Sequence, residues 1–208
     1  MKLAIFDFDG TLIPGDSIVR YIRFAVKERY ASPAQLAGAG LAAAGYKLGL
    51  LDEARAKEIS LRFLLKLPEK EKDALDRDFA ERCLRPLLRK KGLEEIEKRK
   101  AEGYSVWILS ASTRNYMQYM LSPLSADRLI CTEMKDGAVL SNCKGPEKLR
   151  RLGETLKKEG LRCDLRECVA YGDSKSDLPL LKAVGKAYLV DPKRSLRRRA
   201  KGPELLSW

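Results

Sequence analysis

Two aspartates near the start of the sequence, Asp7 and Asp9, stand directly behind a short apolar run, Leu3–Phe6. The run is too short for a helix and predicts a buried strand, so both carboxylates would lie at its carboxyl end, where ligands bind in open α/β sheets. There, one carboxylate could act as a nucleophile and the other could transfer protons. A turn that merely caps a helix is the alternative for an isolated Asp-x-Asp-Gly. The full string LAIFDFDGTL favours the catalytic interpretation.

Further polar side chains follow two later apolar runs. Ser110 follows YSVWIL, and Asp173 follows ECVAYG, with Asp177 four residues beyond it. A hydroxyl at a strand end can hold a phosphoryl oxygen, and two aspartates four residues apart share one face if a helix has begun. Lys144 and Lys148 lie between these runs, near a helix start. Each feature alone is common, but their order and their strand-end positions after DFDGTL indicate a single site.

The elements that would position these groups divide the chain into two kinds of segment. From Ser17 to about Leu88 the chain shows only helical signals, whereas helices and strands alternate from Gly92 onward, which predicts parallel βαβ units. We therefore predict an α/β protein with a Rossmann-like parallel sheet core, formed by residues 1–14 and 86–208, and a helical lobe of residues 15–85. We predict helices over residues 17–30, 52–67, 68–82, 93–103, 113–121, 145–160 and 177–185. A further helix is predicted to begin at Ser32. The predicted strands are 3–6, 104–109, 128–134, 138–142, 167–172 and 186–191, with the third and fourth as a small hairpin.

The composition limits the possible chemistry. The sequence contains no histidine, which excludes phosphohistidine enzymes, Ser-His-Asp triads and histidine-ligated zinc. Its 41 Lys and Arg against 29 Asp and Glu give a formal net charge of +12. That charge favours anionic partners such as phosphate esters, acidic lipid or nucleic acid, without choosing among them. The five cysteines are odd in number and lack CxxC spacing, which predicts reduced thiols and a cytoplasmic protein.

We expect no targeting or membrane-spanning segment. Met1 and Lys2 lead directly into the first strand, and the sequence has no wholly apolar run of about 18 residues. Residues 34–51, AQLAGAGLAAAGYKLGLL, come nearest to such a run, and we expect a buried or amphipathic helix there. The alternative is a segment that contacts the inner face of the cytoplasmic membrane.

In their order along the chain, the motifs resemble those of the haloacid dehalogenase superfamily of phosphohydrolases: DFDGT, the Ser110 strand end, a lysine and GDSKSD. The stretch AYGDSKSDLPLLKAVGKAYLVDPKRSLRRRA is similar to the phosphoserine-phosphatase-like group, often labelled subfamily IB. The resemblance implies the fold of that superfamily, with the helical lobe as a cap of the C1 type. It also implies a Mg²⁺-dependent phosphatase that hydrolyses phosphate monoesters.

The same resemblance implies a role for each matching residue. Asp7 would attack phosphorus to form an aspartyl phosphate, and Asp9 would act as general acid and base. The Asp7 side chain, the Asp9 carbonyl and Asp173 would hold Mg²⁺, and Asp177 would order the metal's water ligands. Ser110 and a lysine would stabilise the phosphoryl oxygens. The other candidates for phosphate binding are Gly10, Thr11 and Ala111.

The phosphate-binding lysine has two candidates. A KG string of the kind found in phosphoserine phosphatases points to Lys144, whereas the subfamily IB pattern CxGxEK points to Lys148. We favour Lys148 and keep both.

Few signals in the predicted cap bear on the substrate. Asp16 stands where phosphoserine phosphatases carry a glutamate that binds the substrate amine, which makes phosphoserine one candidate. Phosphatidylglycerophosphate, a substrate of some subfamily IB relatives, is another. Segment 34–51 and the positive net charge would suit peripheral contact with an anionic lipid surface. A third possibility is a phosphotransferase, which passes the phosphoryl group to an acceptor other than water.

A non-enzymatic basic binding module is the alternative from a different class, supported by the cluster Arg194–Lys201. The sequence shows no aromatic platform and no nucleic-acid motif, so we expect no nucleic-acid partner. Cys83 and Arg89 have the Cys-x5-Arg spacing of cysteine phosphatases. The residues between them are bulky and helical and include a proline, which lacks an N–H to bind phosphate. We interpret this segment as the return from the cap to the core.

Overall fold

The computed structural model describes residues 1–198 and 202–208, so the last part of the basic cluster Arg194–Lys201 lies outside the described residues. Seven strands in the described residues form one sheet, in the order β4-β3-β2-β1-β5-β6-β7. All neighbouring strands are parallel except the antiparallel pair β3–β4. The strands are β1 (Leu3–Phe6), β2 (Ser105–Thr113), β3 (Arg128–Lys135), β4 (Ala138–Ser141), β5 (Val169–Gly172), β6 (Lys186–Val190) and β7 (Glu204–Leu206). The predicted α/β fold is confirmed.

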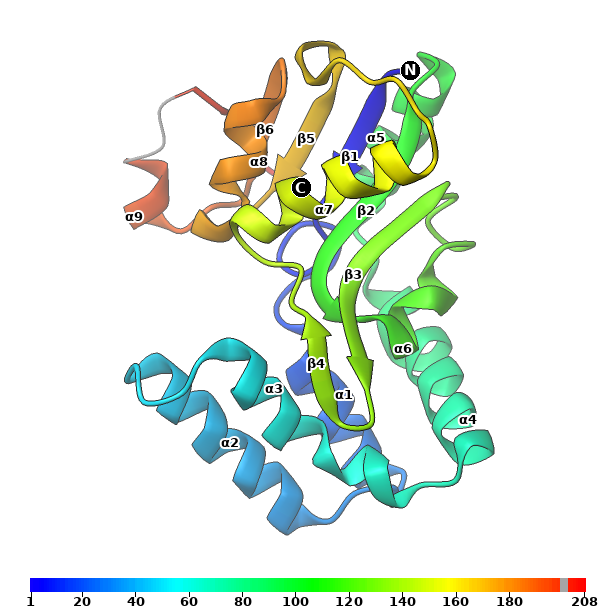
Figure 1. Ribbon diagram of the computed structural model, residues 1–208, viewed down its shortest axis with the longest axis vertical. Coiled ribbons are helices and arrows are strands. Elements are labelled where there is room, and N and C mark those ends of the chain that lie inside the picture. The colour runs from blue at the N-terminus through cyan, green and yellow to red at the C-terminus, as the bar shows by residue number, and fades with distance from the viewer. Residues whose placement is uncertain (199–201) are drawn as a thin grey trace.

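Helices cover both faces of this sheet (Figure 1). Side chains alternate along β1, so Leu3 and Ile5 pack on one face with Leu152, while Ala4 and Phe6 pack on the other. The first face is covered by α7 (Pro146–Lys158), α8 (Leu178–Ala183) and α9 (Arg194–Arg197), and the second by α5 (Lys90–Ala101) and α6 (Arg114–Met117). Burial on both faces explains why β1 is apolar throughout.

The segment between β1 and α5 forms a helical lobe below the carboxyl ends of β1, β2 and β5 (Figure 1). It contains α1 (Ser17–Lys27), α2 (Pro33–Lys47), α3 (Glu53–Leu61) and α4 (Glu69–Phe79), with short turns at Arg62–Lys66, Ala80–Leu84 and Arg85–Leu87. Asp16, Ser32 and Asp52 cap the first three helices by accepting hydrogen bonds from backbone N–H groups. Cys83 lies in one of these helical turns, as expected, and not in a phosphate-binding loop.

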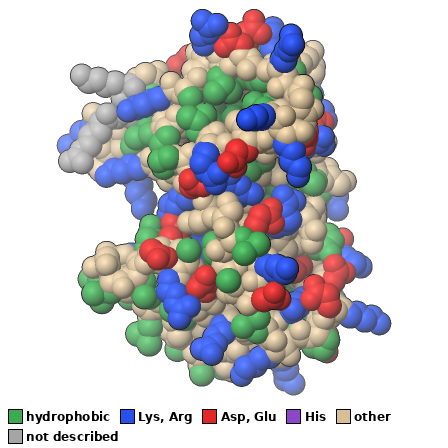
Figure 2. All heavy atoms as spheres, viewed as in Figure 1, with side chains coloured by type: hydrophobic (Ala, Val, Ile, Leu, Met, Phe, Trp, Pro, Cys, Tyr) green, Lys and Arg blue, Asp and Glu red, His purple; other side chains and the backbone are tan. Residues whose placement is uncertain are grey.

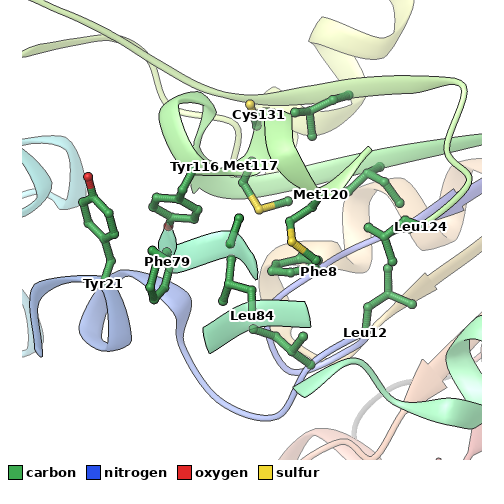
Figure 3. Close-up of a cluster of buried hydrophobic side chains, with 14 of the residues drawn as sticks. Phe8, Leu12, Tyr21, Phe79, Leu84, Tyr116, Met117, Met120, Leu124 and Cys131 are labelled. Atoms are coloured by element: carbon green, nitrogen blue, oxygen red, sulfur yellow. The ribbon is translucent and has the colours of Figure 1, made fainter. Parts of the chain in front are cut away.

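One apolar cluster joins the lobe to the sheet (Figure 3). Phe8 and Leu12, from the loop after β1, belong to the same buried cluster as Tyr21 of α1, Phe79 of α4 and Tyr116 of α6. The ring of Phe79 meets those of Tyr21 and Tyr116 edge-on, with centroids 5.0 Å and 5.1 Å apart. These contacts hold the lobe against the carboxyl ends of the strands.

The strand that carries Ser110 is longer than the sequence predicts. We expected this strand to end at residue 109, but β2 continues to Thr113, and its pairing with β3 shifts register between Ser110 and Thr113. Ser110 therefore lies inside the irregular end of a strand and not behind it. The polar sequence SAST hides this extension, because strand signals depend on apolar or β-branched residues.

The strand β7 was not predicted. It has only three residues, follows a proline, and pairs in parallel with β6, which we expected to be the last strand. The nearby Trp208 packs its ring 5.8 Å from that of Tyr171 and 6.5 Å from that of Phe6. Tertiary contact, and not local propensity, accounts for this strand.

The apolar segment 34–51 also differs from expectation. Its helix α2 buries only Ala39 and Ala42, while Leu41, Leu48 and Leu50 are 74–76% exposed. Hydrophobic side chains are accordingly visible at the end of the lobe where α2 meets α3 (Figure 2). Among residues 1–198 and 202–208, no helix is long and apolar enough to cross a membrane.

Candidate active site

Three of the predicted aspartates come together at the ends of two adjacent strands. Asp7 follows β1, while Asp173 and Asp177 follow β5, and one carboxylate oxygen from each lies within 4.8 Å of the others. The Asp7 N–H donates a hydrogen bond to the Tyr171 carbonyl at 2.9 Å, which extends the strand pairing to this residue. Asp7 and Asp177 are buried, and Asp173 is half-buried. The result is a dense cluster of negative charge at the edge of the sheet.

Lys148 supplies the positive charge in this cluster. Its Nζ lies 2.6 Å from Asp7 Oδ1 and 2.6 Å from Asp177 Oδ1, and the residue is 1% exposed. Lys148 sits in the first turn of α7, on the face that also buries Leu152 and Leu156. The apolar stripe of the helix therefore carries the lysine into the site.

The second candidate lysine lies elsewhere. Lys144 pairs with Glu53 of α3 and donates a hydrogen bond to the Tyr46 hydroxyl at 3.2 Å. Both contacts are to the lobe. Of the two lysines, the structure brings only Lys148 into contact with the aspartates at the strand ends.

Burial and mutual repulsion shift the proton affinities of these groups. Burial, together with the charges of Asp177 and Asp173, raises the pKa of Asp7 above its usual value, although Lys148 partly opposes this shift. Burial and the Asp177 charge likewise raise the pKa of Asp173 to about 6. Burial opposes the charged form of Lys148, but the charges of Asp177 and Asp7 outweigh it and raise the pKa of this lysine. A cation is therefore strongly favoured among these carboxylates.

Asp9 is held by a separate set of hydroxyl groups. Its Oδ1 accepts from the Ser17 N–H at 3.0 Å, and its Oδ2 accepts from the Ser17 and Ser112 hydroxyls at 2.9 Å and 2.6 Å. The Tyr116 hydroxyl lies 2.9 Å from Ser17 Oγ. Burial and the Asp16 charge raise the pKa of Asp9 to about 7, although the hydrogen bonds from Ser112 and Ser17 lower it. A carboxyl group with a pKa near neutrality can both donate and accept a proton.

Glycine and threonine in the turn after β1 fit closely against the cluster. Gly10 has a φ of +79°, and a Cβ at this position would stand 2.3 Å from Asp173 Oδ2. Only glycine fits this turn without strain or displacement of Asp173. Thr11 is fully buried, and its Oγ1 has no hydrogen-bond partner among the residues that the structure describes.

The remaining predicted residues border the cluster. Ser110 is buried, and its Oγ accepts a hydrogen bond from the Ser112 N–H at 3.1 Å. The Ala111 carbonyl accepts one from Lys57 Nζ of α3 at 2.8 Å. Asp16, the candidate for substrate recognition, is exposed and caps α1 through the Val19 N–H at 3.0 Å.

A comparison with protein families decides the identity of the fold. A family model described as haloacid dehalogenase-like hydrolase matches residues 4–182. The chain belongs to the haloacid dehalogenase-like hydrolase family. This result confirms the predicted family resemblance and the predicted α/β fold.

Individual relatives of the chain extend the comparison. It is 34% identical to the "Inhibition of morphological differentiation protein" of Streptomyces azureus over 55% of this chain and 43% of that protein, so it spans less than half of that relative's length. It is 27% identical to "Phosphoserine phosphatase SerB1" of Mycobacterium tuberculosis over 95% of this chain and 67% of that protein.

Solved structures give the same fold. A Bordetella pertussis protein of unknown function shares 25% identity with a TM-score of 0.90, covering 99% of this chain and 97% of that one. A phosphoserine phosphatase, solved as an analogue of its phospho-aspartyl intermediate, has a TM-score of 0.67 at 22% identity, covering 99% and 92% of the two chains.

The donor set of this site fits a magnesium ion. Carboxylate oxygens are the hard ligands that Mg²⁺ prefers, and Asp7, Asp173 and Asp177 offer three of them within one small volume. Burial raises the pKa of Asp7 and of Asp173, and repulsion by the Asp177 charge raises both further, so a divalent cation would relieve this repulsion.

Sequence reasoning missed the hydrogen-bond partners of Asp9. Ser17 begins α1, Ser112 lies in the unexpected extension of β2, and Tyr116 lies in α6. The position of Ser17, eight residues after Asp9 at a helix start, was a weak signal. Ser112 and Tyr116 gave none, because their contact with Asp9 depends on how the lobe packs against β2.

Proposed function

We propose that the chain is a Mg²⁺-dependent phosphomonoester hydrolase that acts through an aspartyl phosphate on Asp7. The observation that carries the proposal is the position of Asp7, which lies at a strand end, in contact with Lys148 and beside Asp173 and Asp177. A carboxylate nucleophile needs a neighbouring cation that also attracts the phosphate, and this arrangement supplies one.

The first chemical step forms a bond between an Asp7 carboxylate oxygen and phosphorus and breaks the bond from phosphorus to the ester oxygen. Asp9 donates its proton to the departing alcohol. In the second step Asp9 takes a proton from water, the water oxygen bonds to phosphorus, and the Asp7 carboxylate is released with inorganic phosphate. A pKa of Asp9 near 7 suits both proton transfers.

Asp7, Asp173 and Asp177, with the Asp9 carbonyl, are the groups that would hold Mg²⁺. When bound, the ion would neutralise charge on the phosphoryl oxygens and on the carboxylates. Lys148 would bind a phosphoryl oxygen from the side of α7. Ser110, Gly10, Thr11 and Ala111 complete the proposed phosphate-binding set.

The identity of the phosphate ester that the chain hydrolyses is a further part of the proposal. Phosphoserine is supported by the name of the 27%-identical relative, and Asp16 stands near Asp9 as a candidate for the substrate amine. Phosphatidylglycerophosphate, with peripheral membrane contact, is supported by the exposed Leu41, Leu48 and Leu50. Phosphotransfer would use the same Asp7 intermediate with an acceptor other than water.

The direct test is phosphate release from a panel of monoesters: p-nitrophenyl phosphate, phosphoserine, sugar and nucleotide phosphates, and phosphatidylglycerophosphate in detergent. Each is assayed with Mg²⁺ and with a chelator, using wild type, Asp7→Asn and the control Asp78→Asn. Asp78 is an exposed aspartate on α4 that pairs with Arg82.

We expect metal-dependent release by wild type and by Asp78→Asn, and a loss of at least about a thousandfold in Asp7→Asn. Release that Asp7→Asn retains would refute the proposed nucleophile. No release by wild type from any ester, even with Mg²⁺, would refute hydrolysis and favour phosphotransfer or a binding role.

A further inference from the structure

A cavity of about 460 Å³ lies between α1, α2 and α3 in the lobe. Most of its wall is apolar and comes from the facing sides of α1 and α2. These apolar lining residues include Ile18, Val19, Ile22, Leu36, Ala39 and Ala43. Small side chains on α2 leave room that larger residues would fill, so the cavity follows directly from the Gly/Ala-rich composition of this helix.

One end of the cavity lies near the strand-end site, although none of Asp7, Asp9 and Lys148 lines it. Asp16 lines it, and the next residue, Ser17, makes two hydrogen bonds to Asp9. Lys57 also lines it and donates a hydrogen bond to the Ala111 carbonyl at 2.8 Å, one residue after Ser110. Ser17 therefore connects the wall of the cavity at Asp16 to Asp9, the group that would protonate the leaving alcohol.

Three of the five charged groups of the lining pair with one another, whereas Asp16 and Arg23 form no salt bridge with a described residue. Lys57 Nζ lies 2.8 Å from Glu53 Oε1, and Lys144 pairs with the other oxygen of the same carboxylate. Lys57 is buried, so its ammonium group is held in these contacts and in the bond to Ala111. An alkyl group would leave these pairs intact and would meet a wall that is mostly apolar.

We propose that this cavity binds the alcohol part of the substrate and selects phosphate monoesters with an unbranched alkyl portion of several carbons. The inference rests on the proposed function, because it places the phosphate at Asp7 and the ester oxygen beside Asp9. The alkyl portion then extends between α1 and α2, where burial of each methylene adds binding free energy.

The test measures binding and not turnover, so it is separate from the test of hydrolysis. A series of alkylphosphonates from ethyl to octyl, which lack the scissile ester bond, is titrated calorimetrically into the protein with Mg²⁺. We expect the Kd to fall about threefold to fourfold per added methylene until the cavity is filled.

Two glycines of α2 provide a matched pair of variants. Gly40 lines the cavity and Gly38 does not, and a Cβ at either position would meet no heavy atom within 4 Å. Replacing glycine inside a helix does not weaken the helix, so both variants should fold. Gly40→Phe would place its ring in the cavity, and Gly38→Phe serves as the control.

We expect Gly40→Phe to weaken octylphosphonate binding at least tenfold, to leave ethylphosphonate binding within about twofold, and to remove the dependence on chain length. Gly38→Phe should behave like wild type. A Kd that does not change with chain length in wild type overturns the inference. So does a Gly40→Phe protein that keeps the wild-type dependence, or one in which ethyl and octyl binding weaken equally. Failure of phosphate release with an intact chain-length dependence would instead count against hydrolysis alone.

Discussion

The strand-end site and the cavity of the lobe are built in opposite ways. At the strand ends four charged groups are held by specific contacts: Lys148 contacts both Asp7 and Asp177, and Asp9 accepts three hydrogen bonds. In the lobe, α2 packs through small side chains, buries only Ala39 and Ala42, and leaves a cavity beside α1. The difference suggests that the rigid part of the molecule supplies the chemistry and the loosely packed part supplies the choice of substrate.

The largest expected contrast lies between the two lysines. Lys148→Met leaves two buried carboxylates without their cation, and we expect the free energy of unfolding to fall by about 4 kcal/mol. The Lys144 side chain is 34% exposed, so Lys144→Met should cost less than about 1 kcal/mol. Urea denaturation at pH 7 measures both. Equal costs for the two variants would contradict the difference in burial and pairing.

The next contrast is between Gly10 and Gly49, which both have a positive φ. Gly10→Ala combines a φ of +79° with a Cβ that would stand 2.3 Å from Asp173 Oδ2. Gly49, after α2, has a φ of +75° but open space around its Cβ position. We expect a loss of about 3 kcal/mol for Gly10→Ala and about 1 kcal/mol for Gly49→Ala, again by denaturation. If Gly10→Ala were as mild as Gly49→Ala, the turn after β1 could not be packed as described.

A buried carboxylate in the lobe predicts a pH dependence of stability. Asp76 accepts hydrogen bonds from the Tyr21 hydroxyl and from Asn115, and burial raises the pKa of Asp76 from 3.8 to about 6. Between these values the folded state holds more protons than the unfolded state, so stability decreases as pH rises through this window and is constant above it. The decrease due to Asp76 should be roughly 2 kcal/mol.

Chemical denaturation of wild type and Asp76→Asn between pH 4 and pH 7 isolates this effect. As pH rises from 4 to 7, the free energy of unfolding of wild type should fall relative to that of Asp76→Asn by roughly 2 kcal/mol. A constant difference across the range would mean that Asp76 ionises normally in the folded protein.

The smallest expected effect concerns the hydroxyl groups around Asp9. Ser112→Ala removes a 2.6 Å hydrogen bond that lowers the pKa of Asp9. The pKa of Asp9 should therefore rise, and the alkaline limb of the pH–rate profile should move to higher pH, with kcat about tenfold lower. Ser122→Ala, at an exposed serine, is the control. An unshifted alkaline limb would exclude Asp9 as the proton donor that this limb reports.

Short-range patterns account for the part of the site that the sequence predicted. Asp7, Asp173 and Asp177 were found because they follow short apolar runs, and parallel strands bring such ends together. The position of Lys148 was also encoded locally, since it is spaced four and eight residues before the buried Leu152 and Leu156. The alternation of helices and strands predicted the α/β fold for the same reason.

The missed features depend on contacts between distant segments. Ser112 reaches Asp9 only because β2 extends beyond its apolar run, and Ser17 does so only because α1 begins beside the sheet. The strand β7 forms on the edge of β6 without a local signal. The cavity between α1 and α2 arises from small residues that read as an apolar helix until their packing is known.

The central claim, that Asp7 becomes phosphorylated, is tested most directly by trapping the intermediate. Asp9→Asn should slow attack by water, while p-nitrophenolate, a good leaving group, still departs without a proton donor. Acid quenching during turnover, proteolysis and mass spectrometry should then find one phosphoryl group on the peptide that contains Asp7, removed by hydroxylamine. A phosphoryl group on another residue, or phosphate release with no phosphopeptide at any time point, would contradict the account.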